Sequence, residues 1–118
     1  MKKAAVVMGS ASDLPLAKEA LKTLAAFGVP HLARVLSAHR TPDEAAAFAK
    51  TAEAEEIGVI IAFAGKAAHL AGAMAANSIV PVIGVPVCGK DLGGLDALLS
   101  TAQMPKGVPV ATVAIDGA

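Results

Sequence analysis

The 118-residue sequence contains no tryptophan, no tyrosine, three phenylalanines and a single cysteine. One cysteine cannot form an internal disulfide, which fits a reducing cytoplasm. With so few aromatic rings, the core must consist mainly of Ala, Val, Leu and Ile. A flavin-binding electron carrier would need aromatic side chains to flank the flavin ring, so the composition argues against that class of protein.

The sequence has no excess of positive or negative charge, because ten basic and ten acidic residues give a formal net charge of zero. A basic surface for nucleic acid is therefore not expected. The apolar runs are far shorter than the roughly 20 residues of a membrane span. Gly9 and Ser10 interrupt the first apolar run before it could form a signal-peptide core. These features predict one globular domain over residues 1–118, located in the cytoplasm.

The sequence does contain a regular alternation of short apolar runs and amphipathic segments. Short, mainly apolar runs of four to seven residues are typical of buried parallel strands, and apolar positions at helical spacing predict the helices between them. The leucines of the last amphipathic segment are assigned to the core. The expected strands are 4–8, 32–36, 57–63, 82–85 and 110–115, and the expected helices are 14–25, 42–52, 69–76 and 92–102.

This alternation predicts an α/β fold, a three-layer αβα arrangement around a five-stranded parallel sheet. At this length a flavodoxin-like strand order, 2-1-3-4-5, is the best match. Such a fold normally has a helix after its fifth strand, and the expected fold has this last helix missing. We therefore expect an apolar sheet face that either a partner subunit or a further C-terminal segment would cover.

In sheets of this type, ligands bind beyond the carboxyl ends of the strands, where the strand order reverses. The first turn at that point is Gly9-Ser10-Ala11-Ser12-Asp13. Ser10 and Ser12 supply hydroxyl groups, and Ser12 or Asp13 is expected to cap the next helix, whose N-terminus attracts anions. A capped helix without a ligand is the alternative, because neither a dinucleotide fingerprint nor a Walker-type phosphate loop is present.

The second turn is Ser37-Ala38-His39-Arg40, followed by a helix start. Thr41 and Glu44 match a capping box, with Pro42 at the first helical position. Capping does not account for His39 or Arg40. A guanidinium group suits phosphate or carboxylate, and histidine is the usual proton carrier at neutral pH. The alternative is a surface His-Arg pair without a role.

The third turn runs from Ala64 to His69 and contains small residues that let backbone amides approach a ligand. His69 is either part of the site or a packed first-turn histidine, and Lys66 is either part of the site or solvated. His31 lies at the opposite end of the sheet, and Cys88 is assigned to packing or a loop. Together the three turns indicate proton transfer on a small phosphorylated, ribose-like ligand, without metal-ligand spacing.

Five segments in order resemble the class I N5-carboxyaminoimidazole ribonucleotide mutases of purine biosynthesis. They are MGSASD (8–13), SAHRTP (37–42), GKAAHLAG (65–72), PVIGVPV (81–87) and the run 94–118. The resemblance implies an isomerase that moves a carboxylate from the exocyclic nitrogen of the ribonucleotide to ring carbon C4. CO2 is released and recaptured in a closed, dry pocket, and no cofactor or metal takes part.

The resemblance also implies a role for each turn. His39 is the general acid and base, Ser37 and Arg40 hold the 5′-phosphate with Ser12 close by, and the third turn surrounds the migrating carboxylate. It further implies a homo-oligomer, an octamer in the family, that binds neither nucleic acid nor membranes. The implied substrate-binding residues are Ser10, Ser12, Asp13, Ser37, Ala38, Arg40, Gly65, Lys66, Ala67, His69 and Leu70.

Two departures from the family pattern stand in the third turn, where many members have Gly for Lys66 and Pro for Ala71. Two other functions stay open: a folded but inactive truncated homologue, and a carboxylase that adds CO2 directly to aminoimidazole ribonucleotide. A receiver-type signalling module would need an aspartate at the end of the third strand, where Phe63-Ala64-Gly65 has none.

Overall fold

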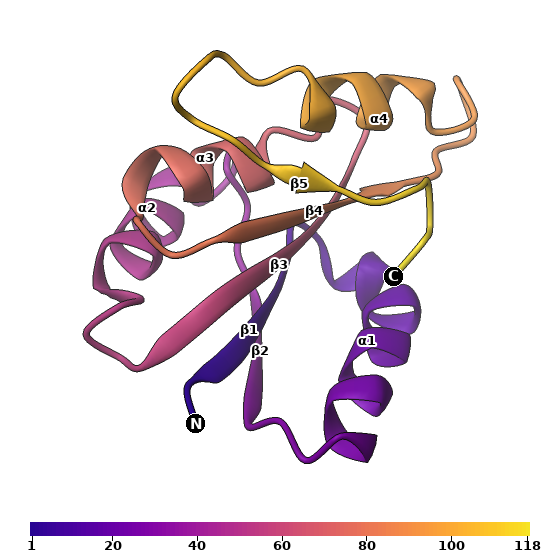
Figure 1. Cartoon of the computed structure of the whole chain (residues 1–118). Helices are drawn as coiled ribbons and strands as arrows, with labels where there is room; N and C mark the ends of the chain where they lie inside the picture. The colour runs from indigo at the N-terminus through magenta and orange to yellow at the C-terminus, as the bar shows by residue number, and fades with distance from the viewer.

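The computed structural model describes all 118 residues and contains every predicted strand and helix (Figure 1). Boundaries differ from the predicted ones by a few residues, except that the fifth strand is much shorter. The strands are β1 (Lys3–Met8), β2 (His31–Val35), β3 (Ile57–Gly65), β4 (Val82–Val87) and β5 (Ala111–Thr112). The helices are η1 (Ala11–Asp13, 3-10), α1 (Leu14–Ala26), α2 (Pro42–Thr51), α3 (Leu70–Asn77) and α4 (Leu95–Ala102).

All five strands are parallel and lie in the order β2-β1-β3-β4-β5, which confirms the predicted flavodoxin-like arrangement. β3 is the longest strand and is paired on both sides, with Ile60 opposite Ala5 and Val82. The expectation of a buried second strand is wrong. β2 lies at the edge of the sheet, and all five of its residues, including the apolar Val35, are exposed or half-buried.

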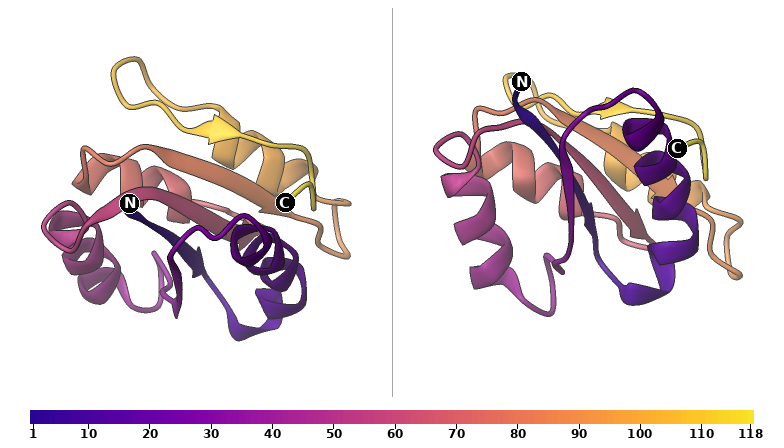
Figure 2. Two further views of the ribbon diagram at one scale, coloured as in Figure 1. Left: turned by 60° about the horizontal axis from the view of Figure 1, so that its bottom comes forward. Right: turned by 90° about the horizontal axis from the view of Figure 1, so that it is seen from below.

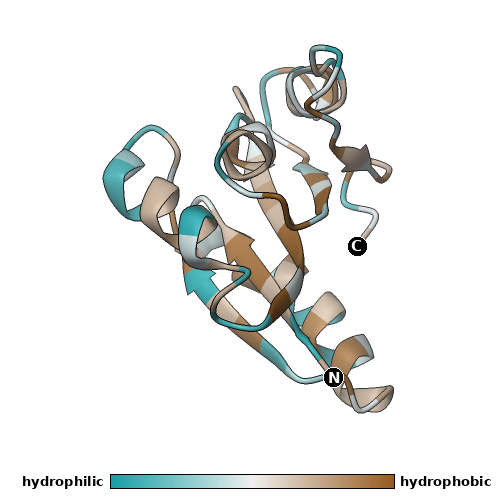
Figure 3. Ribbon diagram, turned by 60° about the vertical axis from the view of Figure 1, so that its left-hand side comes forward, coloured by the Kyte–Doolittle hydropathy of each residue, from teal (hydrophilic) through white to brown (hydrophobic).

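Side chains alternate between the two faces of the sheet and so form two apolar clusters. The larger cluster joins one face to α2 and α3 and includes Val7, Ile60 and Met74. The smaller cluster joins the other face to α1 and includes Met8 and Phe63. Figure 2 shows α1 apart from the other helices, and Figure 3 shows that much of the apolar colour lies on the strands.

One face of the sheet has a single helix, α1, and its apolar side chains toward β4 and β5 are incompletely covered. Ile61 of β3 and Ile83 of β4 are only half-buried there. This agrees with the expected sheet face that lacks its last helix. Apolar side chains on an incompletely covered face favour a further packing partner.

Most leucines of the predicted fourth helix do not belong to the core, contrary to expectation, and Leu98 is the half-buried exception. Leu92, Leu95 and Leu99 are 62%, 54% and 52% exposed, respectively. The residues of α4 that face the sheet are small, Ala97 and Thr101. Only small residues fit because α4 approaches β4 closely, over Gly84, which leaves Leu95 and Leu99 on the outer surface.

Candidate active site

The turns after β1, β2 and β3 line one open crevice of about 300 Å³ at the carboxyl edge of the sheet. All twelve predicted site residues line this crevice, together with two more residues, Gly9 and Ala64. Their roles remain predictions, but the three turns do converge. The predicted residues that line the crevice are Ser10, Ser12, Asp13, Ser37, Ala38, His39, Arg40, Gly65, Lys66, Ala67, His69 and Leu70.

The first turn is capped differently from the prediction. Ser10 caps the short 3-10 helix η1, where its Oγ accepts a hydrogen bond from the Ser12 amide at 3.2 Å. The two serine Oγ atoms also lie 2.8 Å apart. Asp13 stands at the N-cap position of α1 without a side-chain capping bond, and Pro15 in the first turn has no amide hydrogen to satisfy. Neither Ser12 nor Asp13 therefore caps α1 through its side chain.

Asp13 is the one crevice residue with a clearly perturbed acidity. Burial raises the pKa of the Asp13 carboxyl group, a backbone hydrogen bond at Ser10 opposes that rise, and the negative charge of Asp116 adds to it. Asp116 is held near the crevice because its Oδ1 accepts a hydrogen bond from the Cys88 amide at 2.8 Å. The C-terminal segment thus adds, after burial, to the rise in the pKa of the Asp13 carboxyl group.

The second turn is closed by hydroxyl groups. Ser37 Oγ accepts a hydrogen bond from the Arg40 amide at 3.0 Å. Thr41 Oγ1 accepts from the Ser37 amide at 2.9 Å and donates to the Ser37 carbonyl at 3.2 Å. Pro42 begins α2 as predicted, but the capping box is wrong because Thr41 makes no side-chain capping bond. Its hydroxyl bonds to Ser37 instead, which fixes the turn that exposes His39 and Arg40.

The third turn is held by two residues of α4 that the sequence analysis did not select. Ser100 Oγ accepts a hydrogen bond from the Ala68 amide at 2.9 Å and lies 3.3 Å from the Lys66 carbonyl oxygen. Thr101 Oγ1 lies 3.4 Å from the Ala68 carbonyl oxygen. The only signal for them in the sequence is the presence of two hydroxyl residues in an otherwise apolar helix. That pattern does not show which segment the hydroxyl groups contact.

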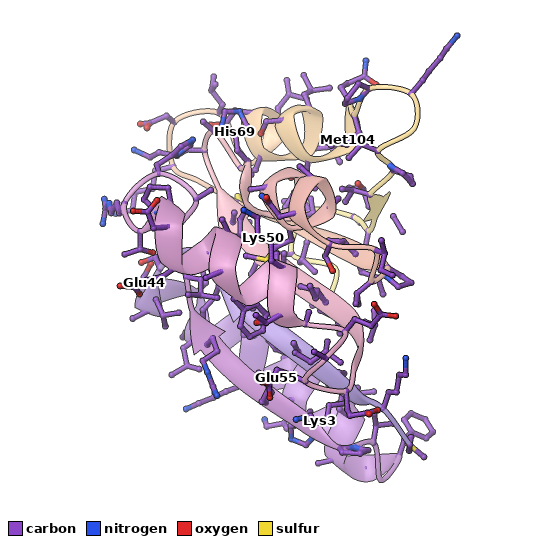
Figure 4. All side chains as sticks on the ribbon, turned by 90° about the vertical axis from the view of Figure 1, so that its left-hand side faces the viewer. Lys3, Glu44, Lys50, Glu55, His69 and Met104 are labelled. Carbon is purple, nitrogen blue, oxygen red and sulfur yellow. The ribbon has the colours of Figure 1, made fainter.

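The two crevice histidines are in direct contact, which the sequence analysis did not predict. His39 Nε2 lies 2.9 Å from His69 Nδ1, and the rings meet edge to face with centroids 4.9 Å apart. His69 occupies the N-cap position of α3. Figure 4 shows it at the end of the molecule opposite Lys3, the first residue of β1. His69 is therefore exposed at the crevice and in contact with His39 rather than packed in the core, and its role stays a prediction.

This contact constrains the protons of both rings. One of the two contacting nitrogens must carry a hydrogen and the other must not. When both rings are neutral, the donor ring has a bare outer nitrogen and the acceptor ring has an outer N–H. The outer nitrogens, His39 Nδ1 and His69 Nε2, make no hydrogen bond to the protein. The neutral pair therefore presents one proton acceptor and one proton donor to a ligand.

Other features of the chain lie apart from this arrangement. His31 bonds through Nδ1 to the Val29 carbonyl at 2.8 Å, at the opposite end of the sheet as expected. Cys88 is an exposed free thiol in the loop after β4. No group of three or more His, Cys, Asp or Glu side chains is placed to hold a metal ion. None of the helices is both long and apolar enough to cross a membrane.

The crevice is open in the single chain. His39, Arg40, Lys66 and His69 are all exposed. The closed, dry pocket implied by the resemblance is thus not formed by this chain alone. The cations in the crevice are Arg40 and Lys66, and the carboxyl group is that of Asp13. Such a crevice suits an anionic ligand whose protons move by way of histidine.

Comparison with known proteins agrees with this geometry. The chain is 58% identical over all 118 residues to N5-carboxyaminoimidazole ribonucleotide mutase from Pyrococcus abyssi, of which it covers 68%. It is 57% identical over 118 residues to the protein of that name from Saccharolobus solfataricus, of which it covers 75%. The crystal structure of Treponema denticola PurE superimposes with a TM-score of 0.86 at 28% identity, over 96% of this chain and 72% of that one.

A family model described as AIR carboxylase matches residues 3–118. The match includes all three turns of the crevice and the α4 residues that hold the third turn. The curated relatives are longer than this chain, which spans about two thirds to three quarters of their length. With a match over nearly its full length, the chain belongs to the AIR carboxylase family.

Proposed function

We propose that this chain is an N5-carboxyaminoimidazole ribonucleotide mutase, an isomerase of purine biosynthesis. It would interconvert N5-carboxyaminoimidazole ribonucleotide and 4-carboxy-5-aminoimidazole ribonucleotide. Relatives of that name at 53–58% identity support the activity. The observation that carries the proposal is the His39–His69 contact inside a crevice that combines cations and hydroxyl groups.

The ligand's phosphate is assigned to the side of the crevice near Arg40. Ser37 Oγ already accepts from the Arg40 amide, so its own proton remains free for a phosphate oxygen. Arg40 is exposed and offers its charged fork to the same group. Ser10, Ser12 and Asp13 line the same crevice and would provide partners for the ribose hydroxyls. Anchoring the remote phosphate would position the imidazole ring against the histidines.

The reaction needs one proton delivered and one proton removed. As CO2 leaves the carbamate, the exocyclic nitrogen gains a proton and becomes an amine. When C4 then bonds to the CO2 carbon, it loses its hydrogen as a proton, so the proton count is unchanged over the cycle. The neutral His39–His69 pair has a donor and an acceptor nitrogen, which matches this requirement. His39 is assigned as the proton carrier, and His69 completes the pair.

A homo-oligomer is proposed as the active form. CO2 would escape from a crevice as open as the one in the single chain, so a covering surface is required. The exposed leucines of α4 and the half-covered sheet face are apolar surfaces available for subunit contacts. Size-exclusion chromatography with light scattering measures the subunit number; a monomer that turns over substrate would contradict this part of the proposal.

The activity is tested by mixing the chain with 4-carboxy-5-aminoimidazole ribonucleotide and following its ultraviolet absorbance at fixed pH. We expect an enzyme-dependent fall as the compound equilibrates with the carbamate. His39→Asn should keep ligand binding and reduce turnover by about 100-fold or more, the usual contribution of a general acid and base. His31→Asn, at the opposite end of the sheet, is the matched control. Full activity of His39→Asn would reject the assignment.

A direct carboxylase is the second candidate. The chain is 54% identical over 112 residues to the chloroplastic phosphoribosylaminoimidazole carboxylase of Vigna aconitifolia, of which it covers 20%. Such an enzyme would add CO2 to aminoimidazole ribonucleotide without a carbamate. Product formation from aminoimidazole ribonucleotide that rises with bicarbonate and does not need the carbamate would favour this activity over the mutase.

A further inference from the structure

Lys66 is one of three non-glycine residues of the chain with a positive φ, a backbone conformation that is unfavourable for most side chains. Its φ is 53°, in the left-handed region where glycine is normally found. Two residues later the turn is anchored to α4, because the Ala68 amide donates to Ser100 Oγ, whose own proton has its nearest acceptor in the Asp96 carbonyl at 2.6 Å. A lysine at this position is therefore unfavourable for folding unless its side chain makes compensating contacts.

The folded chain supplies little compensation. The Lys66 side chain is 77% exposed, and its one ionic partner is Asp91, which is 79% exposed at an Nζ–Oδ2 distance of 3.6 Å. Ion pairs exposed to this extent add little to stability because water and salt screen them. Packing and pairing within the chain thus leave the lysine unexplained, whereas its place in the crevice suggests a role with a ligand.

Arg40 and Lys66 both lie between the two histidines in the sequence, each in the turn that carries one of them. Arg40 follows His39 directly, and Lys66 precedes His69 by three residues, so each cation comes from one of the two turns that the histidines join. A ligand of the proposed class carries two anionic groups, a phosphate and a carboxylate. If Arg40 holds the phosphate, Lys66 is the cation that remains for the carboxylate.

We propose that Lys66 selects the carboxylated ligand, and that Asp91 holds the Lys66 ammonium group while the crevice is empty. This inference rests on the proposed function. When the carboxylated ribonucleotide enters, its carboxylate replaces that of Asp91 as the partner of Lys66. Because the resting pair is exposed and long, the exchange needs little energy. The same ribonucleotide without a carboxylate triggers no exchange.

The exchange predicts how two substitutions change binding. Lys66→Gln should weaken the 4-carboxy ribonucleotide about fivefold and leave aminoimidazole ribonucleotide unchanged, as expected for one exposed charge pair. Asp91→Asn should strengthen binding of the carboxylated ligand about twofold, because a competing carboxylate is removed. Asp91 acts only through Lys66, so the double variant should behave like Lys66→Gln alone.

The experiment is calorimetric titration of the whole chain and its variants with the two ribonucleotides, which differ by one carboxylate. Lys90→Gln is the matched control: it removes the same charge from an exposed residue beside Asp91 that does not line the crevice. It should leave the ratio of the two affinities unchanged. The expected result is a ratio that falls in Lys66→Gln and rises in Asp91→Asn.

Several results would overturn the inference. An unchanged ratio in Lys66→Gln, or equal weakening of both ligands, would show that Lys66 does not recognise the carboxylate. If Asp91→Asn still strengthens binding of the carboxylated ligand in a chain that carries Lys66→Gln, Asp91 does not act through Lys66. If the native chain binds neither ribonucleotide, the proposed function is rejected and this inference with it. Binding of both ligands with one constant ratio rejects the inference alone.

Discussion

Replacing Gly84 by alanine should displace α4, the helix whose Ser100 and Thr101 contact the third turn of the candidate active site. Gly84 lies in β4 and faces α4, where an added Cβ would overlap Thr101 Cγ2. It would also lie 3.0 Å from Val110 Cγ1 and 3.3 Å from Ala71 Cβ, both closer than usual contacts. Because three sides of the site are occupied, the new methyl group can be accepted only if α4 moves away from the sheet.

The size of the effect follows from Thr101. This side chain is 2% exposed, and its Oγ1 lies 3.4 Å from the Ala68 carbonyl oxygen. A β-branched side chain has few alternative rotamers, so it cannot turn its methyl group away and keep that contact. Overpacking of this kind costs about 1–3 kcal/mol of the free energy of unfolding. For a domain of this size the melting temperature should fall by roughly 4–12 °C.

Urea unfolding at one fixed protein concentration measures the loss, with Gly89→Ala as control. A Cβ at Gly89 meets no atom within 4 Å, so that variant should stay within about 0.5 kcal/mol of the native chain. Thr101→Ser removes Cγ2 and keeps the hydroxyl group. Combined with Gly84→Ala, it should recover about 1 kcal/mol or more relative to the sum of the two single changes. Additive effects, or an unchanged stability of Gly84→Ala, would refute this reasoning.

Three further predictions concern the site and its surroundings. Asp13→Asn should raise the melting temperature at pH 7, because burial raises the pKa of the carboxyl group and disfavours its ionised form. This gain should vanish once the pH falls below 3.8, the ordinary pKa of the carboxyl group, and an equal gain at pH 3.5 would contradict the prediction. Ser100→Ala leaves the buried Ala68 amide without its partner and should cost about 1–3 kcal/mol in urea unfolding, whereas a neutral result would mean the third turn is held otherwise. Leu99→Glu should change the subunit number in light scattering with an unchanged circular dichroism spectrum, and an unchanged subunit number would exclude this part of α4 from the interface.

The sequence predicted the features that depend on local pattern. Alternating apolar and amphipathic segments gave the strands and helices, and the strand order then located three turns whose residues line one crevice. Features that depend on packing between segments distant in the sequence were predicted poorly. The leucines of α4 were assigned to the core because apolar spacing does not show which side of a helix meets a sheet. A glycine in β4 brings α4 close and turns the small residues inward.

The capping box failed for a related reason. Thr41 and Glu44 have the right spacing, but spacing does not show whether a better partner is available to the hydroxyl group. Ser37 offers both an amide and a carbonyl within reach, and Thr41 bonds to these instead of the first turn of α2. The same residue types thus form a tighter structure than the motif predicts, and it holds His39 in place.

The two histidines are brought together by different means, and this difference determines which of them a sequence can locate. The turn of His39 follows an edge strand, which has a neighbour on one side only, so it is fixed by bonds within residues 37–41. The turn of His69 follows the central strand and is fixed by Ser100 and Thr101, more than 30 residues away. Local bonds of the first kind are specified by adjacent residues. Bonds of the second kind exist only once α4 has packed on β4, so the histidine contact, and with it the pairing of a proton donor and acceptor, depends on completed folding.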